Sequence, residues 1–103
     1  MADTRHQLLD EALALTERMA RLGDGDDWQA VIELEPQRRQ LLQRAFATQL
    51  PVDEIMAERV RTILDLDKHL MALTVAARDR IAGDISRSSK GRAAANAYRA
   101  AGA

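Results

Sequence analysis

The chain has 103 residues, of which 47% are apolar and 30% are charged, and it has no cysteine; this size allows one modest hydrophobic core, and the composition excludes intrinsic disorder, disulfides, thiolate nucleophiles and zinc–cysteine sites. The 15 basic and 16 acidic residues leave a net charge of −1, so we expect no general affinity for nucleic acid. No apolar run approaches the roughly 18 residues that cross a bilayer, and the N-terminus lacks a signal-peptide pattern, so we predict a cytoplasmic protein without membrane insertion.

The first predicted element is an amphipathic helix over residues 4–22. Apolar residues recur there at spacings of three and four, as one face of a helix requires; they are Leu8, Ala12, Leu15, Met19 and Leu22. All five glycines and Pro51 lie at the apparent boundaries of such segments. Because β-branched residues are sparse and never alternate over five positions, the sequence predicts no strand.

A second helix is predicted over residues 28–48, after a short turn rich in glycine and aspartate. We expect Asp26 or Asp27 to cap it, because a carboxylate accepts hydrogen bonds from the first free amides and faces the positive end of the helix dipole. A calcium loop is disfavoured, since Trp28 occupies the third ligand position and the bidentate glutamate is missing. Pro36 lies inside this helix and is expected to bend it, because proline has no amide hydrogen.

The third predicted helix, over residues 53–82, is the longest element. Its apolar residues cover nearly half of the helix circumference; they are Met56, Val60, Ile63, Leu64, Leu66, Leu70, Leu73, Ala77 and Ile81. At about 45 Å it exceeds the other two helices, each about 30 Å long, so its C-terminal third lacks a cover. We expect the tail at residues 84–101, a flexible or short helical segment, to pack there. The sequence thus predicts an all-α fold: an antiparallel three-helix bundle with a long third helix and a short C-terminal fourth helix, in one domain of residues 1–103.

Catalytic and metal-binding constellations are missing from the sequence. His6 and His69 lie on different helices without metal-ligand spacing, and we interpret both as surface imidazoles. The serines at positions 86, 88 and 89 have no neighbouring acid–base partner, and no glycine-rich turn is present to hold a phosphate. We therefore predict that the protein is not an enzyme and uses no cofactor or metal.

One enzymatic alternative suits a small helical chain rich in arginine. All-helical chorismate mutases hold a dicarboxylate with cationic side chains and need no cofactor, and the candidates here are Arg38, Arg39, Arg78 and Arg80. That family's first helix usually carries an arginine followed by an isoleucine–aspartate pair, which this first helix lacks.

Charged residues occupy positions that the helical pattern predicts to be apolar. Asp67 lies on the apolar stripe of the third helix, and Glu35 and Arg38 lie on that of the second. A buried charge is costly unless it is paired. We therefore predict an interhelical ion pair of Arg38 or Arg39 with Asp67 that sets the register of the two helices. The alternative is that these charges line a groove for a partner helix.

Several short segments, in their order and spacing, resemble the FliT family of flagellar type III export chaperones. They are Gly25-Asp26-Asp27-Trp28, Leu34-Glu35, Arg38-Arg39-Gln40-Leu41-Leu42, Ile63-Leu64, Asp67, Leu70, Leu73, Arg78 and Asn96-Ala97-Tyr98. The resemblance covers nearly the whole chain. It implies a small cytoplasmic helical protein that binds the helical C-terminal part of the filament-cap protein FliD, prevents its premature assembly and passes it to the export gate and its ATPase. It also implies, as in some relatives, a restraint on the flagellar master transcription regulator.

The predicted client-binding groove follows the third helix, with two residues of the second, because a helix-in-groove mode uses apolar anchors three and four residues apart. Its predicted residues are Leu42, Phe46, Ile63, Leu66, Leu70, Leu73 and Ile81. The resemblance implies that the last helix regulates access to the groove; the corresponding tail residues are Arg92, Asn96, Tyr98 and Arg99. The alternative function is a generic helical adaptor or regulator that forms a homodimer through the third helix.

Overall fold

The computed structural model describes residues 4–102, apart from the side chains of residues 89, 94–96 and 98–102. Over this range the fold is all-α, as predicted, with helices α1 (Thr4–Asp24), α2 (Trp28–Ala45) and α3 (Glu54–Gly102) and no strand. None of these helices, over the described residues, is long and apolar enough to cross a membrane. The contacts divide the chain into Met1–Leu73, here called the bundle unit, and Thr74–Ala103, the distal unit.

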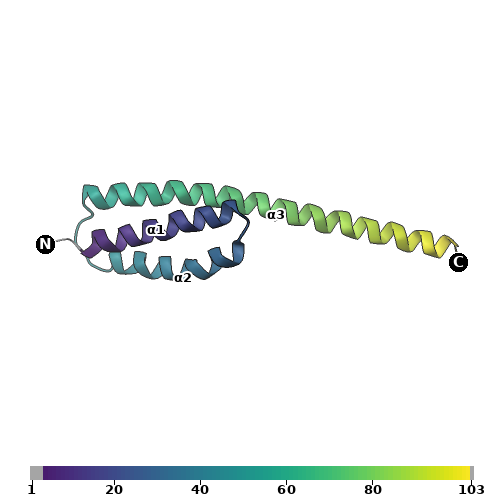
Figure 1. Ribbon diagram of the computed structural model, residues 1–103, viewed down its shortest axis with the longest axis horizontal. Coiled ribbons are helices and arrows are strands. Elements are labelled where there is room, and N and C mark those ends of the chain that lie inside the picture. The colour runs from purple at the N-terminus through teal and green to yellow at the C-terminus, as the bar shows by residue number, and fades with distance from the viewer. Residues whose placement is uncertain (1–3, 103) are drawn as a thin grey trace. The chain divides into compact units, whose positions relative to one another are not determined.

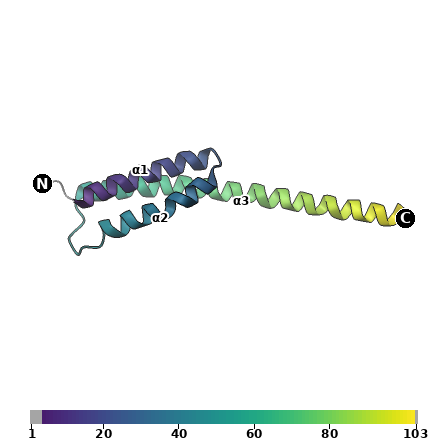
Figure 2. The same ribbon diagram turned by 60° about the horizontal axis from the view of Figure 1, so that its bottom comes forward.

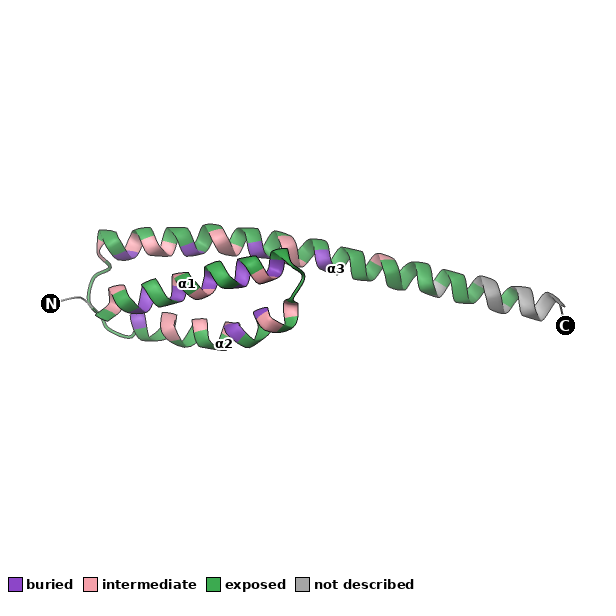
Figure 3. Cartoon of the chain, viewed as in Figure 1, coloured by how far each residue is buried: buried purple, intermediate pink, exposed green. Residues whose placement is uncertain are grey.

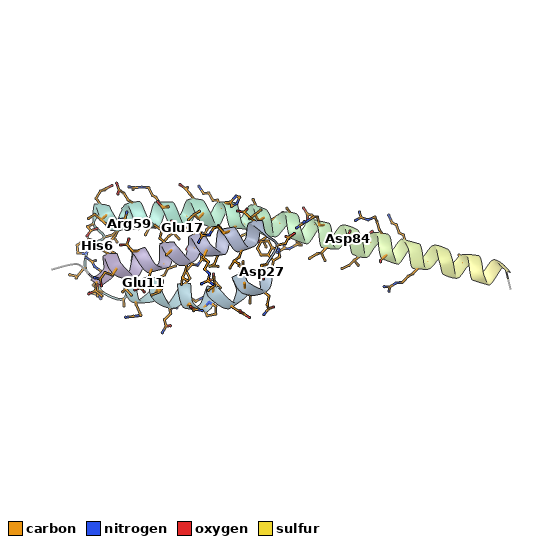
Figure 4. The ribbon with its side chains drawn as sticks, viewed as in Figure 1. His6, Glu11, Glu17, Asp27, Arg59 and Asp84 are labelled. Atoms are coloured by element: carbon orange, nitrogen blue, oxygen red, sulfur yellow. The ribbon has the colours of Figure 1, made fainter. Side chains whose placement is uncertain are left out.

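In the bundle unit, α1, α2 and the first part of α3 run side by side, each antiparallel to the next (Figures 1 and 2). The turn from α1 to α2 is short and hydrogen-bonded, since the amide of Asp27 donates to the carbonyl of Leu22 at 2.9 Å. Asp27 caps α2 by accepting from the amide of Ala30 at 3.3 Å (Figure 4). Asp26 takes a positive φ of 61°, a left-handed conformation that aspartate tolerates better than most residues. The predicted cap therefore falls on Asp27.

The buried residues lie on the facing sides of the helices (Figure 3), and nearly all of those in the described core are apolar. Two clusters of buried residues form it; the first is Leu8, Leu9, Ala45 and Met56, and the second is Met19, Val31, Leu34 and Leu70. Gly23 is also buried, and a Cβ atom there would come within 2.9 Å of Leu70 Cδ1. Glycine at this position therefore permits the close approach of α3 to the end of α1.

The second helix ends earlier than predicted, at Ala45 instead of residue 48. The amide of Phe46 donates to the carbonyl of Leu42 at 3.1 Å, and the chain then leaves the helical conformation. α2 runs through Pro36 without interruption. Arg5 of α1 holds the following loop by donating to the carbonyl oxygen of Pro51 at 3.0 Å, so the loop backbone has a partner in α1.

The third helix is longer than predicted, because its backbone is helical without interruption from Glu54 to Gly102. It does not end near residue 82, and the expected C-terminal helical segment is the continuation of α3. Gly83 and Gly91 had been interpreted as boundaries, but a single glycine costs a helix only about 1 kcal/mol relative to alanine. Both prolines precede α3, and proline is the residue that would end it.

Continuity of α3 changes the interpretation of the tail. We expect from the sequence that residues 92–101 fold back onto the end of the third helix, near Ile81. They instead continue the same helix beyond Ile81, so this expectation is wrong. Ile81 is 59% exposed. Asp84 and Arg87 form an ion pair three residues apart, which supports the helix from its own surface.

Candidate functional site

A group of polar side chains lies where all three helices meet in the bundle unit. Arg38 of α2 donates to Asp67 of α3, to Glu35 of α2 at 2.7 Å and to the hydroxyl oxygen of Thr16 of α1 at 3.5 Å. Thr16 is fully buried, and its hydroxyl donates to the carbonyl of Ala12 at 2.8 Å. We call Thr16, Glu35, Arg38 and Asp67 the central polar cluster. On each helix it lies between residues of the two apolar clusters.

The predicted interhelical ion pair is formed by Arg38, whereas Arg39 lies 3.7 Å from Glu35. The Arg38 side chain is only 12% exposed, and that of Asp67 is 36% exposed. The Nε atom of Arg38 is buried and has no hydrogen-bond partner among the described atoms. Because a guanidinium taken out of water is costly unless carboxylates compensate it, Asp67 and Glu35 hold the buried charge and α2 stays in register with α3.

The seven residues of the predicted groove differ in burial. Ile63 and Leu70 are buried and belong to the core. The other five keep accessible surface; they are Leu42, Leu66 and Leu73, which are half-buried, and Phe46 and Ile81, which are exposed. Ile63 and Leu70 therefore pack in the core beneath this surface and are not available for contact with a partner.

One side of α3 in the bundle unit faces α1. Arg59 and His69 each contact an aspartate of α1, at 2.7 and 2.9 Å respectively. Leu66 is seven residues after Arg59, and Leu73 is four residues after His69, so helical spacing places both leucines on this same side. Leu66 and Leu73 consequently lie toward α1.

The other side of α3 faces α2, because Asp67 contacts Arg38 there. Leu64 is three residues before Asp67 and Met71 is four residues after it, so both lie on the α2 side. Leu64 is 54% exposed and Met71 is 64% exposed. Both line a shallow hollow of about 580 Å³ on α3 that opens to solvent; its other lining residues are Arg61, Asp65, Asp67 and Lys68.

The second helix contributes apolar side chains to the same surface. Leu42 is four residues after Arg38, and the C-cap residue Phe46 is four residues after Leu42, so both lie on the α3 side of α2. Ile32 is six residues before Arg38, about 120° around the helix, and lies at the outer border of this side. Ile32 is 63% exposed and Phe46 is 45% exposed. We name this surface the α2–α3 face and define it by its six residues: Ile32, Leu42, Phe46, Leu64, Asp67 and Met71.

The predicted groove and the α2–α3 face agree only in part. Leu42 and Phe46 belong to the face, but the structure does not bring Leu66 or Leu73 to it. The sequence analysis did not assign the exposed side chains of Ile32 and Met71 to the groove. The spacing of four residues between Asp67 and Met71 could have predicted that both lie on the same side of α3.

The two histidines each lie beside an aspartate. His6 Nε2 is 2.7 Å from Asp53 Oδ2, where α1 begins (Figure 4). The other carboxylate oxygen of Asp53 accepts from the amide of Met56 at 2.8 Å. The pKa of Asp53 is lowered, mainly by this backbone hydrogen bond and to a smaller extent by the hydrogen bond with His6. Asp53 thus caps the start of α3 in its ionised form.

The predicted tail residues are only partly described. Arg92 is exposed. The side chains of Asn96, Tyr98 and Arg99 lie outside the described part of the structure, in which their backbone belongs to α3. Among the side chains that the structure describes, no group of three or more histidines and acids could hold a metal ion.

Comparison with known protein families gives a match over most of the chain. Residues 6–100 match the family model described as flagellar protein FliT, which spans nearly the whole chain. A search of the curated proteins and a search of the solved structures each found no match.

Proposed function

Because the chain belongs to the FliT family of flagellar export chaperones, we propose that it binds the helical C-terminal part of the filament-cap protein FliD. By covering apolar client surface it keeps FliD from assembling prematurely, and it then delivers FliD to the export gate and its ATPase. A client helix that would otherwise self-associate requires such a cover, since exposed apolar surface drives association.

The observation that carries this proposal is the exposed apolar surface of the α2–α3 face. Four large apolar side chains, two on α3, one on α2 and one at the C-cap of α2, are between 45% and 64% exposed; they are Ile32, Phe46, Leu64 and Met71. Soluble proteins rarely leave such side chains grouped on one surface unless a partner covers them. We assign the client to this face.

The length of the face suits a short helix. Ile32 and Phe46 are fourteen residues apart on α2, which corresponds to about 21 Å along the helix axis. A client helix of about four turns spans the same distance. Binding of an amphipathic helix along such a surface is a common mode of peptide recognition.

The test uses aspartate substitutions on the α2–α3 face. Leu64→Asp and Met71→Asp should each weaken binding of the C-terminal segment of FliD by at least about tenfold, because the complex would bury an unpaired carboxylate. Isothermal titration calorimetry gives the affinity, and circular dichroism checks that each variant is folded.

Two further variants serve as controls. Ile85→Asp alters an equally exposed residue of α3 in the distal unit and should leave the affinity within about twofold of wild type. Leu66→Asp alters the α1 side of α3, where the sequence had placed part of the groove. If Leu66→Asp abolishes binding while folded Leu64→Asp and Met71→Asp bind normally, the client lies on the α1 side and our assignment is wrong.

We also propose that the C-terminal end of α3 regulates access by the client, as the family resemblance implies for its last helix. Truncation after Lys90 removes Arg92 and the three tail residues that follow it, Asn96, Tyr98 and Arg99, while leaving the bundle unit complete. Because α3 is continuous in this structure, self-inhibition requires its C-terminal end to leave the helix and cover the client surface for part of the time. Tighter binding of FliD by the truncated chain would support this, because a surface that is closed for part of the time binds more weakly. Equal or weaker binding would reject self-inhibition.

A further inference from the structure

The α2–α3 face has a polar centre between two apolar ends. On one side of the Arg38–Asp67 pair, Ile32 lies six residues before Arg38 and Met71 lies four residues after Asp67, and the antiparallel helices bring both to the same end of the face (Figure 2). At the other end, Leu64 is three residues before Asp67 and Phe46 continues α2. A helix along the face therefore crosses Asp67 between its two apolar contacts.

The Asp67 carboxylate keeps acceptor capacity on this surface. Asp67 Oδ1 accepts a hydrogen bond from Arg38, and the side chain of Asp67 is 36% exposed. An ionised carboxylate offers about four acceptor positions and no donor. A partner helix that covers Asp67 without supplying a donor would strip water from these positions and lose affinity.

The charge of the buried group that contains Asp67 favours a cationic donor; of the two cations that line the hollow, Arg61 contacts Glu54 at 3.0 Å and Lys68 is exposed. Asp67 and Glu35 share the single buried guanidinium of Arg38, so these three groups together carry one negative charge. Arg39 is largely exposed and 3.7 Å from Glu35, and solvent screens a pair of this kind. Arginine and lysine donate charge-assisted hydrogen bonds to carboxylates, which are stronger than neutral ones.

Leu64 and Met71 set the spacing that a partner must match. They are seven residues apart, which is about two helical turns or 10.5 Å. Asp67 lies three residues from one and four from the other. A complementary helix therefore carries apolar residues about seven positions apart and a donor three or four positions after the first.

We propose that Asp67 determines the specificity of the α2–α3 face by selecting helices that carry arginine or lysine midway between two apolar residues seven positions apart. The inference rests on the proposed binding of FliD to this face and adds the chemistry by which one helix is preferred to another. An apolar helix without the central cation should bind more weakly, because it leaves Asp67 covered and unpaired.

The first experiment compares Asp67→Asn with Asp65→Asn, using the C-terminal segment of FliD as the probe. Asparagine at position 67 still accepts from Arg38 through its carbonyl oxygen but loses its charge. We expect the affinity to fall by about tenfold or more, the value of one charge-assisted hydrogen bond. Asp65 lines the same hollow and is exposed, so Asp65→Asn makes the same charge change and should alter the affinity by less than about twofold.

The second experiment leaves the chaperone unchanged and therefore does not depend on the folding of a variant. Each arginine and lysine of the FliD segment is replaced in turn by methionine. One replacement should weaken binding to the wild-type chain by about tenfold and have little further effect with Asp67→Asn, which is the signature of direct coupling.

Each outcome decides the inference. Equal binding by wild type and folded Asp67→Asn, or an equal loss with Asp65→Asn, overturns the role of Asp67 while the proposed function stands. Undiminished binding by every methionine variant of the segment also overturns it. Failure of wild type to bind the FliD segment overturns the proposed function and this inference together.

Discussion

Residues 4–73 bury apolar side chains from three helices against one another, whereas among the described side chains of residues 74–102 the larger apolar ones, such as Ile81 and Ile85, are exposed. The charges differ as well. Residues 1–73 carry nine basic and fourteen acidic residues, a net charge of −5, and residues 74–103 carry six basic and two acidic residues, a net charge of +4. Helical structure in the bundle unit is therefore supported by packing, and in the distal unit by helix propensity and local ion pairs.

The largest expected effect separates the two units by their response to loss of side-chain volume. Leu9 is fully buried, so Leu9→Ala should lower the free energy of unfolding by about 2–5 kcal/mol. Ile81→Ala should change it by no more than about 0.5 kcal/mol, because Ile81 is exposed. Urea denaturation monitored by circular dichroism measures both. Comparable losses from the two variants would mean that Ile81 is packed in solution.

The next effect concerns the central polar cluster. Asp67→Ala should destabilise the bundle unit by about 2 kcal/mol, less than the 3–5 kcal/mol of a fully buried pair, because Asp67 is partly exposed whereas Arg38 is not. A double-mutant cycle with Arg38→Met should give a coupling energy between the two sites, and the corresponding cycle with Arg39→Met should give none. Absence of coupling to Arg38 would leave Asp67 without a structural role.

Glycine substitutions should have opposite effects in the two units. Gly23→Ala should destabilise the bundle unit by about 1 kcal/mol net, since the strain of the close contact with Leu70 exceeds the gain in helix propensity. Gly91→Ala meets no described atom within 4 Å and should stabilise the distal helix by up to about 1 kcal/mol. Denaturation measures the first effect, and amide hydrogen exchange of the distal residues measures the second. Slower exchange with Gly91→Ala is the expected result, and unchanged exchange would contradict a continuous helix there.

The smallest expected effect is a dependence on pH at the start of α3. The pKa of Asp53 is lowered in the folded chain from its ordinary value of 3.8. The ionised cap therefore contributes its full stability above that ordinary value, and the contribution is lost as the pH falls through the lowered pKa. Asp53→Asn should reduce this part of the acid dependence, whereas Asp84→Asn in the distal unit should not. Thermal unfolding between pH 2 and about pH 6 compares the two variants.

Much of the bundle unit was predictable from the sequence because periodicity reports which residues face inward. The pairing of Arg38 with Asp67 followed from two charges on apolar stripes. The side of α3 that faces α2 was not predictable. The apolar residues of α3 cover nearly half of its circumference, and both borders of this apolar surface have similar residues. Only a contact between helices, such as that of Arg38 with Asp67, shows which border faces α2. The predicted groove therefore includes Leu66, which lies on the α1 side of α3, and omits Met71, which lies on the α2 side. The continuity of α3 was not predicted, because Gly83 and Gly91 were interpreted as helix boundaries. A single glycine weakens a helix only slightly, whereas proline ends it.

Pro36 leaves one backbone group of α2 outside the helical hydrogen-bond ladder. The carbonyl oxygen of Ile32 would accept from an amide at position 36, and proline has none. Both residues are exposed, so this oxygen can be hydrated. With one rung missing at its midpoint, α2 can bend there at a lower cost than a fully bonded helix. The segments on either side of Pro36, which carry Ile32 and Phe46, can then adjust separately to helices of different curvature.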